Sequence, residues 1–274
     1  MSKTDLIKLD DFYIKREDQN PTGSAKDRAL SSQVENLRKL GLTTKAVISS
    51  TGNAAISASY FCQKANIDLT IFLSPKINPN KLKLIKTKNN TIIIDPKPIS
   101  SAFKFAKNNN AYFLRQSTDP SALEGYGQIG QEIIDQLPQV TSIFIPVGSG
   151  TTLLGISQKI PKTTKLFAVQ PANNPTISKH FDHDYLAETT SLTDSLSVKF
   201  LPLRLAVISA INKSGGGGLV ITDSQIKKQL DYLESNNIST SPESAMALAG
   251  LVKARSTNID VGSHPLVIFT GTNR

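Results

Sequence analysis

The chain has 274 residues, of which 39% are hydrophobic and 19% charged, so it can bury a large core and is not expected to be disordered. The formal net charge is +9, but the lysines are scattered and tryptophan is absent, so we expect no nucleic-acid partner. We expect neither a membrane span nor a secretory leader. The single cysteine, Cys62, predicts no disulfide and no metal site, and it favours a cytoplasmic protein with a buried structural thiol.

The first predicted helix follows a turn near residue 20. Pro21 and Gly23 are turn residues, and Ser24 is a good N-cap for the helix after it. Lys26 then falls in the first helical turn, where the positive partial charge of the helix N-terminus disfavours an ammonium group. Such a lysine could act as an amine nucleophile, and an ordinary surface lysine is the alternative.

Short apolar strands and helices alternate from residue 45 onwards. The segments that we predict as strands cover residues 45–49, 69–73, 91–94, 142–146 and 166–169, and the helices cover residues 53–65, 80–88, 99–108, 121–137 and 151–159. This alternation predicts parallel sheets that are covered by helices. Ligands of such folds bind where the carboxyl ends of strands lead into helices.

Two of these strand-to-helix junctions carry residues suited to anions. At the first, the hydroxyls of Ser50 and Thr51, the Asn53 amide and the backbone N–H groups could bind a carboxylate, although a plain capped turn is the alternative. At the second, residues 148–152 read Gly-Ser-Gly-Thr-Thr at a helix start. They form a good phosphate cradle that lacks the Walker lysine.

The C-terminal third contains one low-complexity segment and one further apolar strand. Residues 214–218, Ser-Gly-Gly-Gly-Gly, predict a flexible loop or helix terminator. The strand at residues 266–269 ends in Thr270, whose hydroxyl could bond to a heterocycle nitrogen. His180 and His183 lie in a polar stretch without a third ligand, so we expect no metal there.

Together and in this order, the segments resemble the pyridoxal 5′-phosphate (PLP) enzymes of fold type II, the tryptophan-synthase-β-like superfamily. The resemblance runs from about residue 14 to residue 270. Residues 20–28 are similar to the family's N-P-T-G-S-F-K-D-R, residues 50–54 to its asparagine loop, and residues 148–152 to its phosphate loop. Residues 242–249 resemble a helix start of the family.

This resemblance implies a fold and a set of roles. We expect two three-layer α/β lobes with mostly parallel sheets and PLP in the cleft between them, the small lobe being residues 20–129 and the large lobe residues 1–19 and 130–274. Lys26 would form a Schiff base with PLP and shuttle protons. Gly148, Ser149, Gly150, Thr151 and Thr152 would bind the cofactor phosphate, Asn53 the 3′-oxygen and Thr270 the pyridine nitrogen, while Ser50, Thr51, Asn53 and Ala54 would hold the substrate carboxylate. A homodimer is the usual assembly of the family.

The motifs divide between reactions on small amino acids. Residues 20–28 and 50–53 are most similar to threonine synthase, which converts O-phosphohomoserine to threonine. Ala122 and Gly127 replace the arginine and lysine of that enzyme's R-x-E-G-Q-K-T segment, and Arg115 or Ser117 could replace the arginine. Residues 15–18 and 119–128 resemble serine/threonine dehydratase instead. A cysteine-synthase-like β-replacement comes third, and a PLP-binding protein without activity and a nucleic-acid-binding protein are alternatives of other classes.

Overall fold

The computed structural model describes residues 1–41, 43–50, 52–86, 90–194, 196 and 201–273. The chain forms two compact units, each with more contacts within itself than with the other. Unit 1 comprises Lys26–Gly125, and unit 2 comprises Ser2–Ala25 together with Tyr126–Asn273. The lobe boundaries that we drew at residues 20 and 129 stay a prediction.

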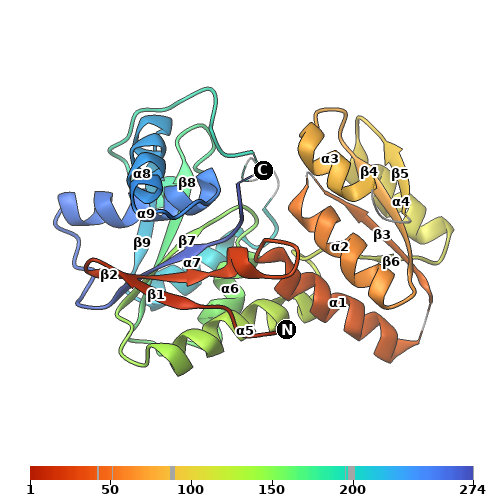
Figure 1. The fold of residues 1–274 in the computed structure, drawn as a ribbon, viewed down its shortest axis with the longest axis horizontal. Coiled ribbons are helices and arrows are strands. Elements are labelled where there is room, and N and C mark those ends of the chain that lie inside the picture. The colour runs from red at the N-terminus through yellow and green to blue at the C-terminus, as the bar shows by residue number, and fades with distance from the viewer. Residues whose placement is uncertain (42, 51, 87–89, 195, 197–200, 274) are drawn as a thin grey trace. The chain divides into compact units, whose positions relative to one another are not determined.

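Unit 1 is built on a four-stranded, fully parallel sheet with the order β5-β4-β3-β6. Two helices follow β3 and β4 on one face of this sheet, and α4 returns from β5 to β6 on the other face (Figure 1). Helix α1 packs against α2. The bounds are α1 Lys26–Leu40, β3 Lys45–Ser49, α2 Asn53–Lys64, β4 Asp68–Leu73, α3 Pro79–Lys86, β5 Thr91–Ile94, α4 Pro98–Asn108 and β6 Tyr112–Phe113.

Unit 2 is built on a six-stranded sheet with the order β1-β2-β10-β7-β8-β9. Only β1 is antiparallel to its neighbour, and all other pairs are parallel. The strands are β1 Leu6–Leu9, β2 Phe12–Arg16, β7 Ser142–Pro146, β8 Lys165–Pro171, β9 Gly217–Ile221 and β10 Pro265–Phe269. The helices are α5 Pro120–Gln136, which belongs to unit 2 from Tyr126 onwards, α6 Thr151–Ser157, α7 Arg204–Lys213, α8 Asp223–Ser235 and α9 Pro242–Ser256. Short 3-10 turns lie at η1 Glu17–Gln19 and η2 Ser178–His180.

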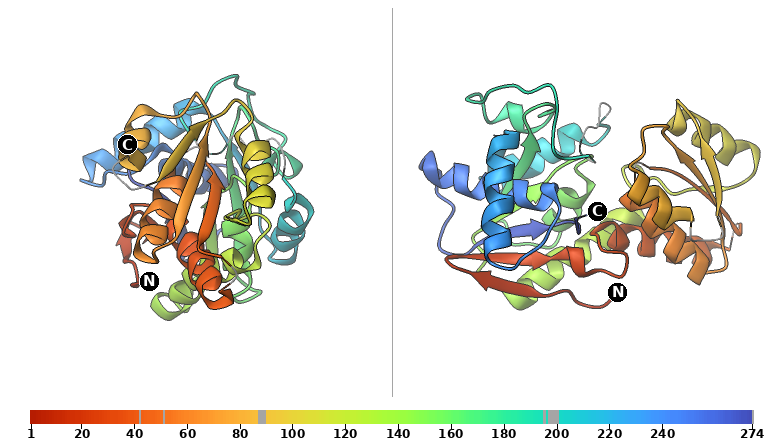
Figure 2. Two further views of the ribbon diagram at one scale, coloured as in Figure 1. Left: turned by 90° about the vertical axis from the view of Figure 1, so that its right-hand side faces the viewer. Right: turned by 45° about the horizontal axis from the view of Figure 1, so that its top comes forward.

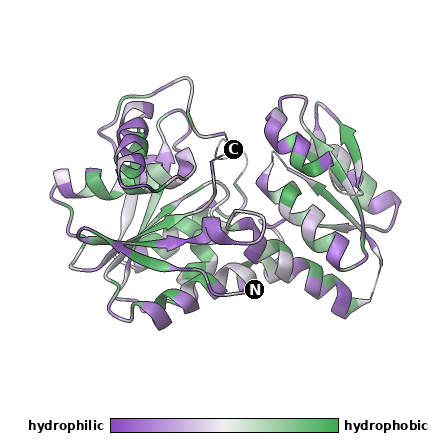
Figure 3. Ribbon diagram, viewed as in Figure 1, coloured by the Kyte–Doolittle hydropathy of each residue, from purple (hydrophilic) through white to green (hydrophobic). Residues whose placement is uncertain are grey.

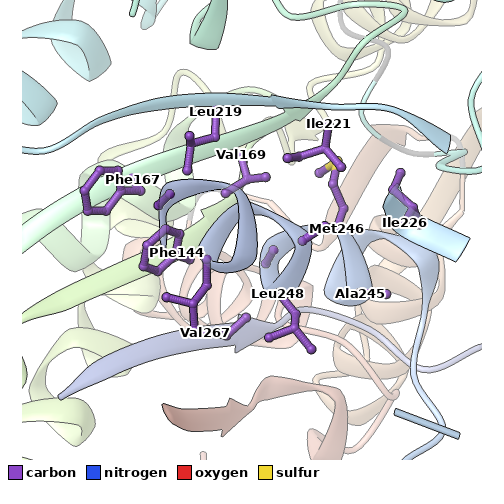
Figure 4. Close-up of a cluster of buried hydrophobic side chains, with 14 of the residues drawn as sticks. Phe144, Phe167, Val169, Leu219, Ile221, Ile226, Ala245, Met246, Leu248 and Val267 are labelled. Atoms are coloured by element: carbon purple, nitrogen blue, oxygen red, sulfur yellow. The ribbon is translucent and has the colours of Figure 1, made fainter. Parts of the chain in front are cut away.

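Helix α9 forms the centre of the unit 2 core. It lies across β7, β8, β9 and β10, and its Met246 and Leu248 point into the apolar side chains of these strands (Figure 4). The rings of Phe144 and Phe167 stack at 4.7 Å in the same cluster. Burying a large apolar side chain contributes about 1.5–3 kcal/mol, so this cluster fixes the strands that carry the site described below.

The apolar residues follow the strands of both sheets (Figure 3). On β7 every residue is buried, and the same holds for β10, because each of these strands is covered on both faces. In each unit, helices flank the sheet (Figure 2). Most of them mix polar and apolar residues, as expected for elements with one exposed side (Figure 3). The buried runs explain why the strands were visible as apolar segments in the sequence.

The predicted α/β class with mostly parallel sheets is confirmed. The prediction for residues 214–218 is confirmed in part. Ser214 is the C-cap of α7, and Gly215, with a φ of 68°, follows it, as expected of a helix terminator. Gly217 and Gly218 belong to strand β9 and not to a flexible loop, because they pair with Phe167 and Ala168 of β8. Within the described parts of the chain, none of the helices is both long and apolar enough to cross a membrane, and no group of His, Cys, Asp or Glu could hold a metal ion.

Candidate functional site

Three adjacent parallel strands of unit 2 present their carboxyl ends at one edge of the sheet. They are β2, β10 and β7, and the strand order reverses between β10 and β7. Ligands of open α/β sheets bind at such a reversal, outside the carboxyl ends. The segment before Lys26 follows β2, Thr270 follows β10, and residues 147–152 follow β7. The sheet therefore brings the predicted phosphate loop, residues 148–152, to the same edge as Thr270, the residue predicted to contact the pyridine nitrogen.

The backbone before Lys26 is fastened to the end of β10. The N–H of Ala25 donates to the Thr270 carbonyl oxygen at 2.9 Å, and the N–H of Thr272 donates to the Gly23 carbonyl oxygen at 3.0 Å. Ser24 forms an antiparallel bridge with Gly271 between them. Lys26 is the next residue of the chain and the first of α1, as predicted. The amine-bearing side chain therefore leaves from a backbone that is held beside Thr270.

Ser24 is not the helix cap that its position in the sequence suggested. Its side chain is buried, and its Oγ has no hydrogen-bond partner among the described residues. The same is true of Oδ1 of buried Asn20, whose Nδ2 donates to the Glu17 carboxylate at 2.7 Å. Buried polar atoms normally find a partner in protein, water or a ligand. Two unused oxygens just before Lys26 therefore fit a segment that faces a polar ligand.

A serine that the sequence did not single out supports the end of β10. Ser244 lies in the first turns of α9 and is fully buried. Its Oγ accepts the N–H of Thr270 at 3.0 Å and lies 3.4 Å from the N–H of Gly271. Ser244 was one letter of a helix-start motif, and only the packing of α9 on β10 reveals that it orients Thr270.

The predicted phosphate loop has the donors that a phosphate needs. Gly150 is the N-cap of α6 and has a φ of 85°, in the left-handed region that favours glycine. The Ser149 Oγ and Thr151 Oγ1 atoms lie 2.9 Å apart. Residues 148–152 offer hydroxyls and backbone N–H groups and contain no acidic side chain, a donor set that suits the phosphate of PLP.

The predicted carboxylate loop lies in unit 1, at the equivalent place of that sheet. It follows β3, and the strand order β5-β4-β3-β6 reverses between β3 and β6. Gly52 has a φ of 152° and donates its N–H to the Ser50 Oγ at 3.1 Å, and Asn53 is the first residue of α2. Ser50, Asn53 and Ala54 thus lie together at the start of this helix, whereas Thr51 lies outside the described residues.

Asp119, which belongs to the dehydratase-like segment, has structural partners. Its Oδ2 accepts the Tyr112 hydroxyl at 2.6 Å and the Gln33 amide at 2.7 Å, and its Oδ1 accepts the Ser121 hydroxyl at 2.6 Å. Burial and the hydrogen bond to Asp119 raise the pKa of Tyr112 to about 12. Asp119 therefore joins β6 to α1 and to the start of α5.

Known proteins similar to this chain are enzymes of amino-acid metabolism. Threonine dehydratase 2 of tomato (Solanum lycopersicum) is 27% identical over 197 residues, which are 68% of this chain and 33% of that protein. The threonine synthase of Methanosarcina acetivorans is 27% identical over 274 residues, 90% of this chain and 66% of that protein. The chain thus spans about a third to two thirds of the length of these curated relatives.

The fold is shared with solved structures. Maize serine racemase superposes with a TM-score of 0.87 over 100% of this chain and 89% of that one, at 17% sequence identity. At that identity the likeness concerns the fold alone. A family model described as "Pyridoxal-phosphate dependent enzyme" matches residues 2–271. Because this match spans nearly the whole sequence, the chain belongs to the family of pyridoxal-phosphate dependent enzymes, with fold type II.

Proposed function

We propose that this protein catalyses PLP-dependent elimination or replacement on a small amino acid, and specifically the conversion of O-phospho-L-homoserine to L-threonine. The observation that carries the first part is the hydrogen bond from Ala25 to Thr270, which holds the backbone of the lysine segment beside the end of β10. The two unused oxygens of Asn20 and Ser24 support a ligand at this place.

The residues of unit 2 and Lys26 would hold the cofactor. Residues 148–152 would donate hydroxyl and backbone N–H groups to its phosphate, and Lys26 would bind its aldehyde carbon through Nζ. Thr270 would contact the ring nitrogen with a hydroxyl rather than a carboxylate, which suits elimination better than transamination. When bound, PLP supplies a ring that stabilises negative charge on the substrate's α-carbon.

The residues of unit 1 would hold the substrate. Ser50, Asn53 and Ala54 offer a hydroxyl, an amide and a backbone N–H to its carboxylate, and Asn53 would also donate to the 3′-oxygen of the cofactor. Lys26 Nζ would accept the proton from the α-carbon once the cofactor is released to the amino acid. Holding the carboxylate fixes the orientation of that C–H bond relative to the lysine.

Arg115 supports threonine synthase chemistry. The N–H of Leu114 donates to the Val47 carbonyl oxygen at 2.9 Å, so Arg115 follows β6 beside the end of β3, the strand that leads into the carboxylate loop. Ala122 is fully buried in α5 and offers no positive charge to a substrate phosphate. We propose that Arg115 binds the substrate phosphate in place of the missing arginine.

Threonine dehydratase is the second candidate. The tomato relative favours it, as does the absence of an arginine at position 122. The two reactions differ in the need for a phosphate site. For a threonine synthase, we expect Arg115→Ala to lower kcat/KM for O-phospho-L-homoserine by about 100-fold, the loss of a charge-assisted contact. For a threonine dehydratase, the same substitution should leave deamination of L-threonine unchanged.

The decisive experiment compares wild type with Lys26→Ala. We expect wild type to take up PLP with a visible absorbance band, and borohydride reduction to attach the cofactor to the peptide that contains Lys26. Phosphate and threonine should then form from O-phospho-L-homoserine, and neither should form with Lys26→Ala. Cofactor uptake without turnover of O-phospho-L-homoserine, L-threonine, L-serine or O-acetyl-L-serine would instead indicate a PLP-binding protein without activity.

The compartment and the assembly are also proposals. A single buried thiol suits a reducing cytoplasm, and the family favours a homodimer. Light scattering of the purified protein at several concentrations would measure its mass, and a mass of one chain at all of them would reject the homodimer.

A further inference from the structure

Gln170 of β8 holds the peptide bond that leads into the predicted phosphate loop. The parallel ladder between β7 and β8 ends at this point, where the N–H of Val147 donates to the Val169 carbonyl oxygen at 3.0 Å. The next ladder bond would run to the Val147 carbonyl oxygen from the N–H of residue 171, but residue 171 is a proline and has no N–H. The Gln170 side chain takes its place, because Nε2 donates to the Val147 carbonyl oxygen at 3.1 Å.

The other partners of Gln170 fix the orientation of its amide. Its Oε1 accepts the backbone N–H groups of Ile177 at 2.7 Å and Ser178 at 2.8 Å, and its Nε2 also donates to the Thr176 hydroxyl at 3.3 Å. The side chain is fully buried, and every donor and acceptor position of its amide is used. Because two backbone N–H groups face Oε1, the amide cannot be turned over, and its N–H must face Val147.

A fixed Val147 carbonyl group also fixes the N–H of Gly148. The peptide bond between these two residues is planar and trans, so its C=O and its N–H point in opposite directions. Since the carbonyl points at Gln170, the N–H of Gly148 points away from it. Without Gln170 this peptide could rotate, because no ladder bond restrains the carbonyl. A donor that is oriented before its ligand arrives costs less on binding than one that must be ordered at that moment.

Helix α7 holds the same loop from another side. A Cβ built on Gly150 would stand 2.3 Å from Val207 Cγ2, so glycine at this position allows α7 to approach the loop closely. Arg204, the first residue of α7, donates through Nε to the Thr176 carbonyl oxygen at 3.1 Å. Since the Thr176 hydroxyl is a partner of Gln170, one side chain connects the start of the loop with the segment that anchors α7.

Building on the proposed function, we propose that Gln170 is a positioning residue of the cofactor site, which turns the N–H of Gly148 towards the phosphate of PLP. Its polar atoms are all used within the protein, so it acts through the Val147 carbonyl and not by touching the cofactor. An ionised glutamate at this position could still accept the N–H groups of Ile177 and Ser178. It would have no N–H for Val147, however, and it would add a negative charge near a phosphate.

The experiment compares PLP with pyridoxal, which has the same ring and aldehyde but no phosphate. Both dissociation constants are measured by titrating the visible absorbance of the protein, with Lys26→Ala as the correction for reaction at other lysines. Gln170→Glu keeps the size and the acceptor and removes the donor. Gln229→Glu is the matched control, because Gln229 is also a buried glutamine of unit 2 and lies on α8, away from the proposed site.

We expect Gln170→Glu to weaken PLP binding by about 10- to 100-fold and pyridoxal binding by less than about threefold, because only PLP uses the phosphate loop. Gln229→Glu should leave both dissociation constants within about twofold of wild type. In wild type, the Gly148 amide, followed by NMR, should exchange more slowly with solvent when PLP is bound, and pyridoxal should not slow it. This last measurement needs no variant, so it tests the inference even if Gln170→Glu does not fold.

The inference and the proposed function can fail separately. If Gln170→Glu weakens both ligands equally or neither of them, or if PLP does not protect the Gly148 amide, Gln170 only supports the fold, and the proposed function stands. If wild type takes up neither PLP nor pyridoxal at Lys26, the proposed function fails, and the role of Gln170 fails with it.

Discussion

Lys15 is a fully buried cation with three oxygen partners. Its Nζ donates to the Thr4 carbonyl oxygen at 2.8 Å, to the Glu132 carboxylate at 2.6 Å and to the Gln136 amide oxygen at 2.8 Å. These bonds join β2 to α5 within unit 2. Such a network is costly to break because the Glu132 carboxylate, of which only 12% is exposed, loses the positive charge that it contacts.

We expect Lys15→Met to lower the free energy of unfolding by about 3–5 kcal/mol. Urea unfolding followed by circular dichroism would measure it. Lys227→Met is the matched control, since Lys227 and Asp231 form an exposed pair on α8 that should contribute less than about 0.5 kcal/mol. Equal losses of unfolding free energy for the two substitutions would show that burial does not increase the contribution of the Lys15 ion pair to stability.

Cys62 should be chemically silent in the folded protein. It is fully buried in α2, and burial raises the pKa of its thiol to about 12. The raised pKa means that the protonated thiol contributes to the free energy of unfolding. This contribution is complete below the pKa of the unfolded state, about 8.5, and it is lost as the pH rises from there towards 12. A thiol reagent at pH 8 should therefore label Cys62 in urea and not in buffer, and rapid labelling of the native protein would contradict the structure.

Some of the site residues could be predicted from the sequence, because they form contiguous motifs. Lys26 was expected in the first turn of a helix and is the first residue of α1. Ser244 could not be found in this way, because it acts on Thr270 across the contact between α9 and β10. Contacts of this kind depend on which elements pack together, and no local pattern encodes them.

At the scale of single elements, the glycines at the start of β9 are not equivalent. A Cβ on Gly216 would stand 1.9 Å from the Leu166 carbonyl oxygen. A Cβ on Gly217 would meet only the Phe167 ring, at an ordinary contact distance of 3.6 Å. The close approach of two backbones therefore requires glycine at position 216 but not at position 217.

We expect Gly216→Ala to destabilise the fold by at least about 1–3 kcal/mol, as overpacking does when the neighbour is rigid backbone. Gly217→Ala, its neighbour in sequence, should stay within about 1 kcal/mol of wild type. Thermal unfolding of both variants would decide the matter. A similar loss for both would mean that the strand tolerates no side chain at either position.

The elements that the sequence analysis predicted well are those with buried apolar runs. The bounds of β3, β5 and β7 agree with the predicted segments, because these strands are short, apolar and separated by clear helices. The strand part of the glycine run was misjudged because glycine in a strand and glycine in a loop look alike without the partner strand. Strand β6 has only two residues and was not predicted, since so short a strand has no periodicity of its own.

At the scale of the whole molecule, the two sheets differ in how the chain supplies them. All strands of unit 1 come from one continuous segment, residues 26–125. The sheet of unit 2 joins β2, near the start of the sequence, to β10, near its end, and Tyr13 pairs with Leu266. Pairing between such distant residues closes a long loop and slows folding.

The β2–β10 pairing therefore sets an order of assembly during synthesis. Residues 26–125 can complete their own sheet soon after they leave the ribosome. Strand β2 cannot pair with β10 until about residue 270 has been synthesised. We expect pulsed hydrogen exchange during refolding to protect amides of β3 and β4 before those of β2 and β10. The lysine segment follows β2 and is fastened to Thr270, so the protein should acquire its affinity for PLP only in the last step of folding.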